Sequence, residues 1–153
     1  MDVKALIARQ RAIIEAPKTD GLNVALGGEL VPVEVARLMP DDWQLLVAAH
    51  PPRKSSRTDA NIGYDQHGLC RSYPADRITV AGEPIDAETW ADLWDSLNSV
   101  NKNNVHTLIW GLNVYDAIKE LQELGKAAAG SPSSSPGNRA SRRAGSKGGS
   151  PQK

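Results

Sequence analysis

Three histidines and one cysteine are the residues of this chain that could support metal binding or nucleophilic catalysis. His67 and Cys70 form a His-x-x-Cys pair, whereas His50 and His106 are isolated. A structural zinc site needs four nitrogen or sulfur ligands, usually as two close pairs, and a second pair is missing. A cysteine nucleophile also needs a group that orients its base and a loop that holds the oxyanion, and neither is visible. We therefore expect no metal, no cofactor and no enzymatic activity.

Glycine-rich and basic stretches do not indicate a nucleotide site or a specific nucleic-acid site. Gly27-Gly28 separates two alternating apolar runs, and Gly148-Gly149 is not part of a phosphate-binding loop. Basic and acidic residues number 18 each, but residues 130–153 hold five basic residues and no acid, which leaves 13 basic against 18 acidic residues in 1–129. The basic segment has no aromatic residues for base stacking, so we expect only weak phosphate contacts.

The composition favours a globular domain over 1–129 and a disordered basic tail over 130–153. The tail is rich in Ser, Gly and Pro, and its only apolar residues are two alanines, so it cannot bury enough surface to offset its ordering entropy. A single cysteine excludes an internal disulfide and favours a reducing compartment. We expect no secretory signal, because the N-terminus leads into an amphipathic pattern and not into an apolar core with a cleavage site, and no membrane span, because no apolar run approaches ~20 residues.

Two elements are predicted before residue 40. The first is an amphipathic helix closed by Pro17, with an apolar face formed by Val3, Leu6, Ile7, Ile13 and Ile14 and with Lys4, Arg9 and Arg11 outside. The second is a β-hairpin around the two-residue turn Gly27-Gly28, with Val24 opposite Val31 and Leu22 opposite Val33. Pro32 cannot donate to a strand ladder, so we expect its strand at a sheet edge.

Residues 41–53 have the sharpest boundaries in the chain. Asp41 is a candidate N-cap, and Gln44 three residues later completes the pattern of a capping box. The apolar stripe of this segment consists of Trp43, Leu46 and Val47. Pro51-Pro52 follows His50 and cannot continue a helix. The pattern predicts a short buried helix that ends at His50 and is followed by an extended basic arm.

Residues 53–84 are predicted to be mostly loop, with a turn near Gly63-Tyr64 and a short strand over 78–80. Order resumes at Asp86, a good N-cap for a helix whose core face holds Trp90, Leu93, Trp94 and Leu97. The opposite face carries Glu88, Asp92 and Asp95 without a lysine four residues on. This acidic face is either solvated or a docking surface for a basic partner.

The last predicted helix, about residues 104–124, is apolar on two sides. One stripe, Val105, Leu108, Ile109 and Leu112, faces the core. A second seam about half a turn away contains Trp110, Val114, Ile118 and Leu121. Such a helix is buried between layers or presents one face to a partner. We predict that the second seam binds a partner, and that the whole fold is α+β, mainly helical, with one N-terminal hairpin and about four helices.

The order of these segments resembles the tail assembly chaperones of long-tailed, siphovirus-type phages that infect actinobacteria. Members of that family show a strand hairpin, a Trp-Leu-Val-Ala-His-Pro-Pro-Arg-like helix end, a Gly-Tyr-Asn/Asp turn, a Trp-containing helix and a short basic tail. The corresponding positions here span residues 22–115, and the family-like motif consists of Trp43, His50, Pro51, Pro52, Arg53, Gly63 and Tyr64. The sequence departs from the family after Tyr64, where polar residues 65–71 replace an apolar helix.

The resemblance implies a non-enzymatic role in the host cell cytoplasm. Such chaperones bind the tape measure protein, a long helical and aggregation-prone chain, and keep it soluble while tail subunits polymerise around it. The implied partners are the tape measure protein, the major tail protein and a frameshifted longer form of the chaperone, without specific nucleic acid or membrane contacts. The alternative is a virion structural protein, such as a head–tail connector or tail-completion subunit, that stays in the particle.

Overall fold

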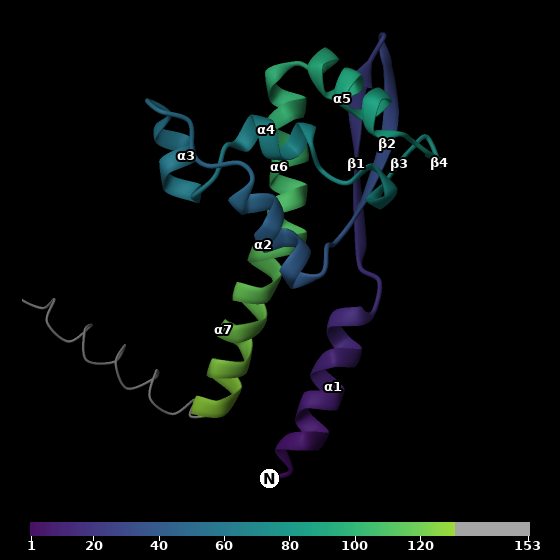
Figure 1. The fold of residues 1–153 in the computed structure, drawn as a ribbon. Coiled ribbons are helices and arrows are strands. Elements are labelled where there is room, and N and C mark those ends of the chain that lie inside the picture. Colours follow the sequence, from purple (N-terminus) through teal and green to yellow (C-terminus); the bar gives the residue numbers. More distant parts are fainter. Residues whose placement is uncertain (131–153) are drawn as a thin grey trace, which may run out of the picture. The chain divides into compact units, whose positions relative to one another are not determined.

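The computed structural model describes residues 1–130 and shows an α+β fold, mainly helical, with one antiparallel sheet (Figure 1). This confirms the predicted fold class. The chain divides into two compact units, Met1–Ala117 and the part from Ile118 onward. The predicted disordered tail lies outside the described residues, except for Gly130. No helix within residues 1–130 has both the length and the apolar character to cross a bilayer.

The predicted hairpin forms with the predicted register. β1 (Thr19–Leu26) runs antiparallel to β2 (Glu29–Ala36), with Val24 opposite Val31 and Leu22 opposite Val33. Gly27 and Gly28 have φ angles of 61° and 85°, the left-handed conformation that a two-residue hairpin turn requires at both positions. Burial alternates along both strands, so one face of the sheet enters the core and the other stays exposed.

The predicted edge position of β2 is wrong. β3 (Ile78–Val80), the short strand expected from the sequence, pairs with the far side of β2, and β4 (Glu83–Pro84) pairs with β3, so the sheet order is β1-β2-β3-β4. Pro32 is tolerated inside the sheet because it lies where the ladder between β2 and β3 ends. The last β2–β3 pair is Val33 with Val80, so β3 does not need an N–H from Pro32 as a hydrogen-bond donor. The Pro32 carbonyl still accepts the N–H of Ala81 at 2.8 Å.

α5 (Ala87–Ser96) and α6 (Ser99–Trp110) supply most of the helical part of the core. Asp86 is the N-cap of α5, as predicted, and its carboxylate accepts the N–H of Thr89 at 2.7 Å. Asn98 caps α6, which therefore begins about five residues before the predicted start at 104. The buried residues of the core are Val24, Val33, Val35, Leu38, Tyr64, Leu69, Cys70, Tyr73, Ile78, Trp90, Leu93, Trp94, Leu97, Val105, Ile109 and Leu112.

α2 (Pro40–Ala48) begins differently from the prediction. Its N-cap is Met39, without a side-chain hydrogen bond, and Pro40 occupies the first turn, so the expected capping box of Asp41 and Gln44 does not form. Proline suits this position because its φ is preset for a helix and the first N–H groups lack intrahelical partners. The helix ends at Ala48, short of His50, and its apolar residues Trp43, Leu46 and Val47 are half-buried against the core.

The prediction of a loop over most of residues 53–84 is wrong. Two six-residue helices occupy it, α3 (Arg57–Ile62) and α4 (Gln66–Arg71), followed by a 3-10 turn at Ala75–Arg77. Ser56 caps α3 and Asp65 caps α4 by accepting backbone N–H groups. Gly63 ends α3 in the left-handed conformation, with φ 90°. Helices this short leave almost no apolar periodicity, so their caps are their main sequence signal.

α1 (Val3–Glu15) confirms the predicted N-terminal helix, but none of its residues is buried. Its apolar residues Val3, Leu6, Ile7 and Ile13 are exposed. The Arg37 guanidinium anchors its C-terminal end by donating to the carbonyls of Ile13, Ile14 and Ala16 at 3.0–3.2 Å. A cation there complements the unpaired carbonyls and the negative end of the helix dipole.

The last helical segment changes its pitch at Gly111–Tyr115, a π-helical turn between α6 and α7 (Asp116–Ala129). This turn places Asn113 against the end of the sheet. Its Nδ2 donates to the Tyr73 hydroxyl at 3.0 Å, its Oδ1 accepts the Leu38 N–H at 3.0 Å, and Tyr73 donates to the Ala36 carbonyl at 2.8 Å. Burial raises the pKa of Tyr73 to about 12, so its hydroxyl stays protonated and can donate.

Candidate functional site

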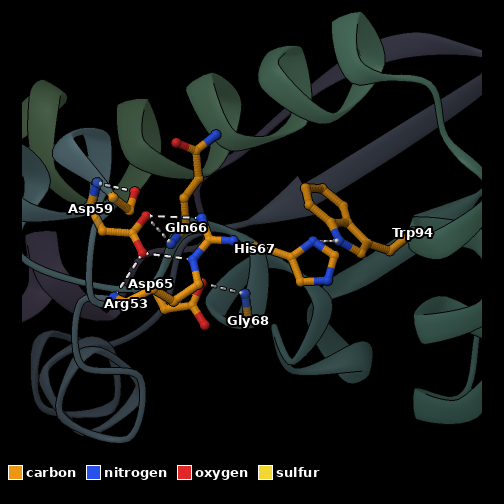
Figure 2. Close-up of polar contacts among 8 residues, drawn as sticks. Arg53, Asp59, Asp65, Gln66, His67, Gly68 and Trp94 are labelled. Atoms are coloured by element: carbon orange, nitrogen blue, oxygen red, sulfur yellow. Dashed lines mark hydrogen bonds and ion pairs between the residues drawn. The ribbon is translucent and has the colours of Figure 1, made fainter.

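Arg53 of the family-like motif contacts a buried carboxylate, Asp59 (Figure 2). Arg53 donates its backbone N–H and its Nε to Asp59 Oδ2 at 2.9 and 2.8 Å, and its Nη2 to Oδ1 at 3.1 Å. The backbone N–H of Gln66 adds a fourth bond to Oδ1 at 3.2 Å. Asp59 is the only fully buried charged residue in the part of the chain that the structure describes. The positive charge that compensates it, on the Arg53 guanidinium, comes from only six residues away in the sequence.

In the Arg53–Asp59 pair the acid is buried and the base is partly exposed to solvent. Half of the Arg53 side chain, 51 %, is exposed, whereas the Asp59 side chain is inaccessible. The hydrogen bond from Arg53 holds the pKa of Asp59 well below its usual range, against the opposing effect of burial. The same bond raises the pKa of Arg53. The pair therefore stays ionised over the whole physiological pH range.

Asp65 links this pair to the end of α2. Its Oδ1 lies 3.0 Å from Arg53 Nε and accepts the Gly68 N–H at 3.1 Å, while its backbone N–H donates to the His50 carbonyl at 2.8 Å. A Cβ on Gly68 would lie 2.6 Å from Asp65 Oδ2 and 3.1 Å from His50 Cδ2. Any larger residue at position 68 would force the Asp65 carboxylate and the His50 ring to shift.

Tyr64 carries the motif into the core. Its ring meets Trp43 edge-on, with 5.7 Å between ring centroids, and its hydroxyl lies 2.6 Å from His106 Nε2. Burial lowers the pKa of His106 and raises the pKa of Tyr64, so both groups stay neutral and the Tyr64 hydroxyl donates a hydrogen bond to the imidazole. Trp43, Tyr64 and His106 thus connect α2 to α6.

The structure therefore brings most of the motif together as a junction between α2, α3, α4 and α6. Pro51 and Pro52 are exposed between His50 and Arg53. The predicted basic arm is wrong, because Arg53 folds back onto Asp59. Sequence reasoning missed Asp59. The run Ser56-Arg57-Thr58-Asp59 matches the pattern of a capping box and was the available signal for α3 and its buried acid.

The pKa of Asp59 predicts a loss of stability in acid. A carboxyl whose pKa is lowered by folding contributes its full stabilisation above its unfolded pKa of about 3.9, and that contribution is lost as pH falls towards the folded value. We expect the free energy of unfolding of the native chain to fall more steeply below about pH 4 than that of Asp59→Asn. Urea titrations at several pH values measure both slopes, and parallel slopes would contradict the pairing. The pKa values of Asp86 and Asp95 are also lowered, but both residues are present in both proteins, so their contributions to the pH dependence cancel in the comparison.

His67 and Cys70 do not form a nucleophile pair. Cys70 is buried, and burial raises the pKa of its thiol, which disfavours the thiolate. The Nδ1 of His67 instead accepts the indole N–H of Trp94 at 3.2 Å (Figure 2), and the Cys70 carbonyl accepts the indole N–H of Trp90 at 2.9 Å. Within residues 1–130, three or more His, Cys, Asp or Glu side chains nowhere group as metal ligands would.

The acidic face of α5 is exposed but partly neutralised. Glu88, Asp92 and Asp95 all lie at the surface. Arg71 of α4 donates Nε and Nη2 to the Asp95 carboxylate at 3.0–3.2 Å, a partner that the sequence pattern within the helix could not reveal. Glu88 and Asp92 make no ion pair within the described residues, so they are the free part of this face.

The second seam of the last helix is only partly free. Trp110 and Val114 are half-buried, and the Trp110 ring stacks on Tyr115 with 5.4 Å between centroids. Ile118 and Leu121 are exposed by 43 % and 72 %. The predicted seam assumes a rotation of 100° per residue along the helix. This rotation does not hold across the wider π-helical turn at Gly111–Tyr115, so the four residues do not form one continuous stripe. The exposed apolar residues of α7 are Ile118, Leu121 and Leu124.

No protein-family model, curated protein or solved structure matches the chain.

Proposed function

We propose that this chain is a tail assembly chaperone that binds the tape measure protein of a long-tailed phage and keeps it soluble during tail assembly. Two features support the proposal. The order of the hairpin, the Trp43-to-Arg53 segment and the Gly63-Tyr64 turn resembles that family. The second is the exposed apolar row of Ile118, Leu121 and Leu124 on α7, which is the observation that carries the proposal.

That row suits a helical client. Ile118 and Leu121 are three residues apart and Leu124 three further, so they share one face of the helix. An amphipathic helix commonly binds such an apolar row through its own apolar face, and water leaves both surfaces. Covering the client's apolar surface would oppose its aggregation.

Ile118→Glu tests the apolar row of α7. We expect the variant to keep the native melting temperature, because Ile118 is exposed, and to lose co-purification with a co-expressed tape measure protein. Gln122→Glu is the matched control, since it adds the same charge to another exposed position of α7. We expect Gln122→Glu to bind as the native chain does. Equal binding by both variants would exclude the apolar row of α7 as the client site. Unfolding of Ile118→Glu would show that this row is buried.

Purified virions distinguish a chaperone from a structural protein. A chaperone leaves when the tail is complete, so quantitative mass spectrometry should find the chain absent or in trace amounts. A fixed number of copies per particle would instead identify a structural subunit, such as a head–tail connector or a tail-completion protein.

A further inference from the structure

β1 is an unpaired sheet edge of eight residues. The closing pair of a two-residue hairpin is hydrogen-bonded, and bonded pairs alternate from there, so Leu22, Val24 and Leu26 bond to β2. The backbone N–H and C=O groups of the alternate residues point away from β2. These are Thr19, Gly21, Asn23 and Ala25. Among residues 1–130 only the Gly21 N–H has a partner, the neighbouring Asp20 carboxylate at 2.8 Å.

A groove lies between this edge and the end of α6. It has a volume of about 290 Å³ and is open to solvent. Leu22 of β1 and Leu108 and Leu112 from the helical side give it an apolar centre, and Asp20 and Asp116 lie at its border. Asp116 is paired with Lys18 at 2.7 Å, whereas Asp20 makes no ion pair within the described residues. The groove therefore combines unpaired backbone groups, an apolar centre and one carboxylate without an ion pair within residues 1–130, Asp20, at its border.

We propose that β1 and this groove bind an extended peptide segment of a partner protein, which adds to the sheet as a further strand. The segment's backbone pairs with Asn23 and Ala25, and an apolar side chain enters between Leu22 and Leu108. Basic residues two positions away from that side chain share its face of the strand and lie near Asp20. In strand addition, backbone hydrogen bonds supply affinity and pockets for alternate side chains supply specificity. An edge strand beside an apolar groove offers both.

The observations favour a basic extended segment over other occupants. A helix has no free backbone groups with which to satisfy the edge, so the helical client proposed for α7 does not account for it. The chain's own residues 131–153 are basic but contain no large apolar residue to fill the groove. The unpaired Asp20 favours lysine or arginine in the partner. The inference is independent of the function proposed above and uses a different surface.

Two variants block the site in different ways. Asn23→Pro removes an outward-pointing N–H, which β2 does not use, and proline is tolerated on an edge strand. Asn23→Ala is its matched control. Gly111→Leu fills the groove from the helical side. Gly111 has helical backbone angles, φ −57° and ψ −48°, and no atom lies within 4 Å of a Cβ built on it, so the groove can accept a side chain there.

The probe is the blocked peptide acetyl-Ser-Lys-Thr-Leu-Thr-Lys-Ser-amide, whose leucine and two lysines share one face of an extended strand, added to the full ¹⁵N-labelled chain. We expect saturable binding, slower amide exchange of Asn23 and Ala25, and about tenfold weaker binding when both lysines are replaced by glutamate. Asn23→Pro and Gly111→Leu should each weaken binding at least about tenfold, and Asn23→Ala should not.

Absence of binding, or binding without protection of the Asn23 and Ala25 amides, would overturn the proposal. Unchanged binding by Gly111→Leu, which tests the groove without altering the strand, would do the same. Sedimentation of the chain without peptide provides a further check. A dimer that Asn23→Pro converts to monomer would make a second copy of the chain the occupant and would contradict a peptide partner.

Discussion

Trp90→Ala is expected to destabilise the chain by about 3–5 kcal/mol, a large share of the 5–15 kcal/mol that holds a typical domain folded. Trp90 is inaccessible to solvent, and its indole N–H donates to the Cys70 carbonyl at 2.9 Å. Alanine would leave a cavity between α5 and α4 and would remove the indole hydrogen bond to the Cys70 carbonyl, which would then keep only backbone donors such as the Tyr73 N–H. Urea unfolding followed by far-UV circular dichroism measures the loss.

Two companion variants locate the cause. Trp90→Phe keeps much of the volume but cannot donate to the Cys70 carbonyl, which retains the Tyr73 N–H at 3.3 Å, so it should lose about 0.5–1.5 kcal/mol for the missing hydrogen bond together with a small packing loss. Leu45→Ala removes an apolar side chain of α2 that is exposed, and it should change stability by less than about 0.5 kcal/mol. If Trp90→Ala were as stable as Leu45→Ala, Trp90 would not lie in the core.

Arg53→Met is expected to cost about 2–3 kcal/mol, the second-largest effect. Methionine keeps much of the apolar stem but leaves the buried Asp59 carboxylate without its cation and without two of its hydrogen bonds. The value is below the 3–5 kcal/mol typical of a fully buried pair, because the guanidinium is half exposed and water can replace part of it. The free energy of unfolding at pH 7 is the measurement.

Arg57→Met is the matched control for Arg53→Met. Arg57 is an exposed arginine at the start of α3 and makes no ion pair within residues 1–130. We expect its replacement to change stability little. Comparable losses in both variants would mean that removal of any positive charge near α3, and not the Arg53–Asp59 pair, is responsible.

The fold was predictable where a sequence pattern was both local and long. Gly27-Gly28 between alternating runs determined the hairpin and its register, and Asp86 with Trp90, Leu93 and Trp94 determined α5. Pattern reading failed where tertiary pairing decides the outcome. Pro32 lacks only its own N–H as a donor, and β3 pairs with β2 from Val33 to Val35, so the missing donor does not prevent the pairing. α3 and α4 have too few turns for periodicity, so only Ser56, Gly63 and Asp65 indicate them.

The candidate site was predictable only in part. The family resemblance singled out His50, Arg53 and Tyr64 but not their partners. His106 lies 42 residues from Tyr64 and reaches it through a tertiary contact, whereas Asp59 lies six residues from Arg53 and was signalled only by the cap pattern from Ser56. The helical seam was extrapolated at a constant pitch from Trp110 to Leu121. The π-helical turn that places Asn113 against Tyr73 breaks that pitch, and nothing in the apolar pattern shows it.

The solubility of the tape measure protein is the most direct test of the proposed chaperone function. The tape measure protein is expressed alone, with the native chain, or with Ile118→Glu, and its fraction in the supernatant after centrifugation is measured. We predict that the native chain moves most of the tape measure protein into the soluble fraction, and that Ile118→Glu leaves it in the pellet. A soluble fraction that is the same with and without the native chain would contradict the chaperone function.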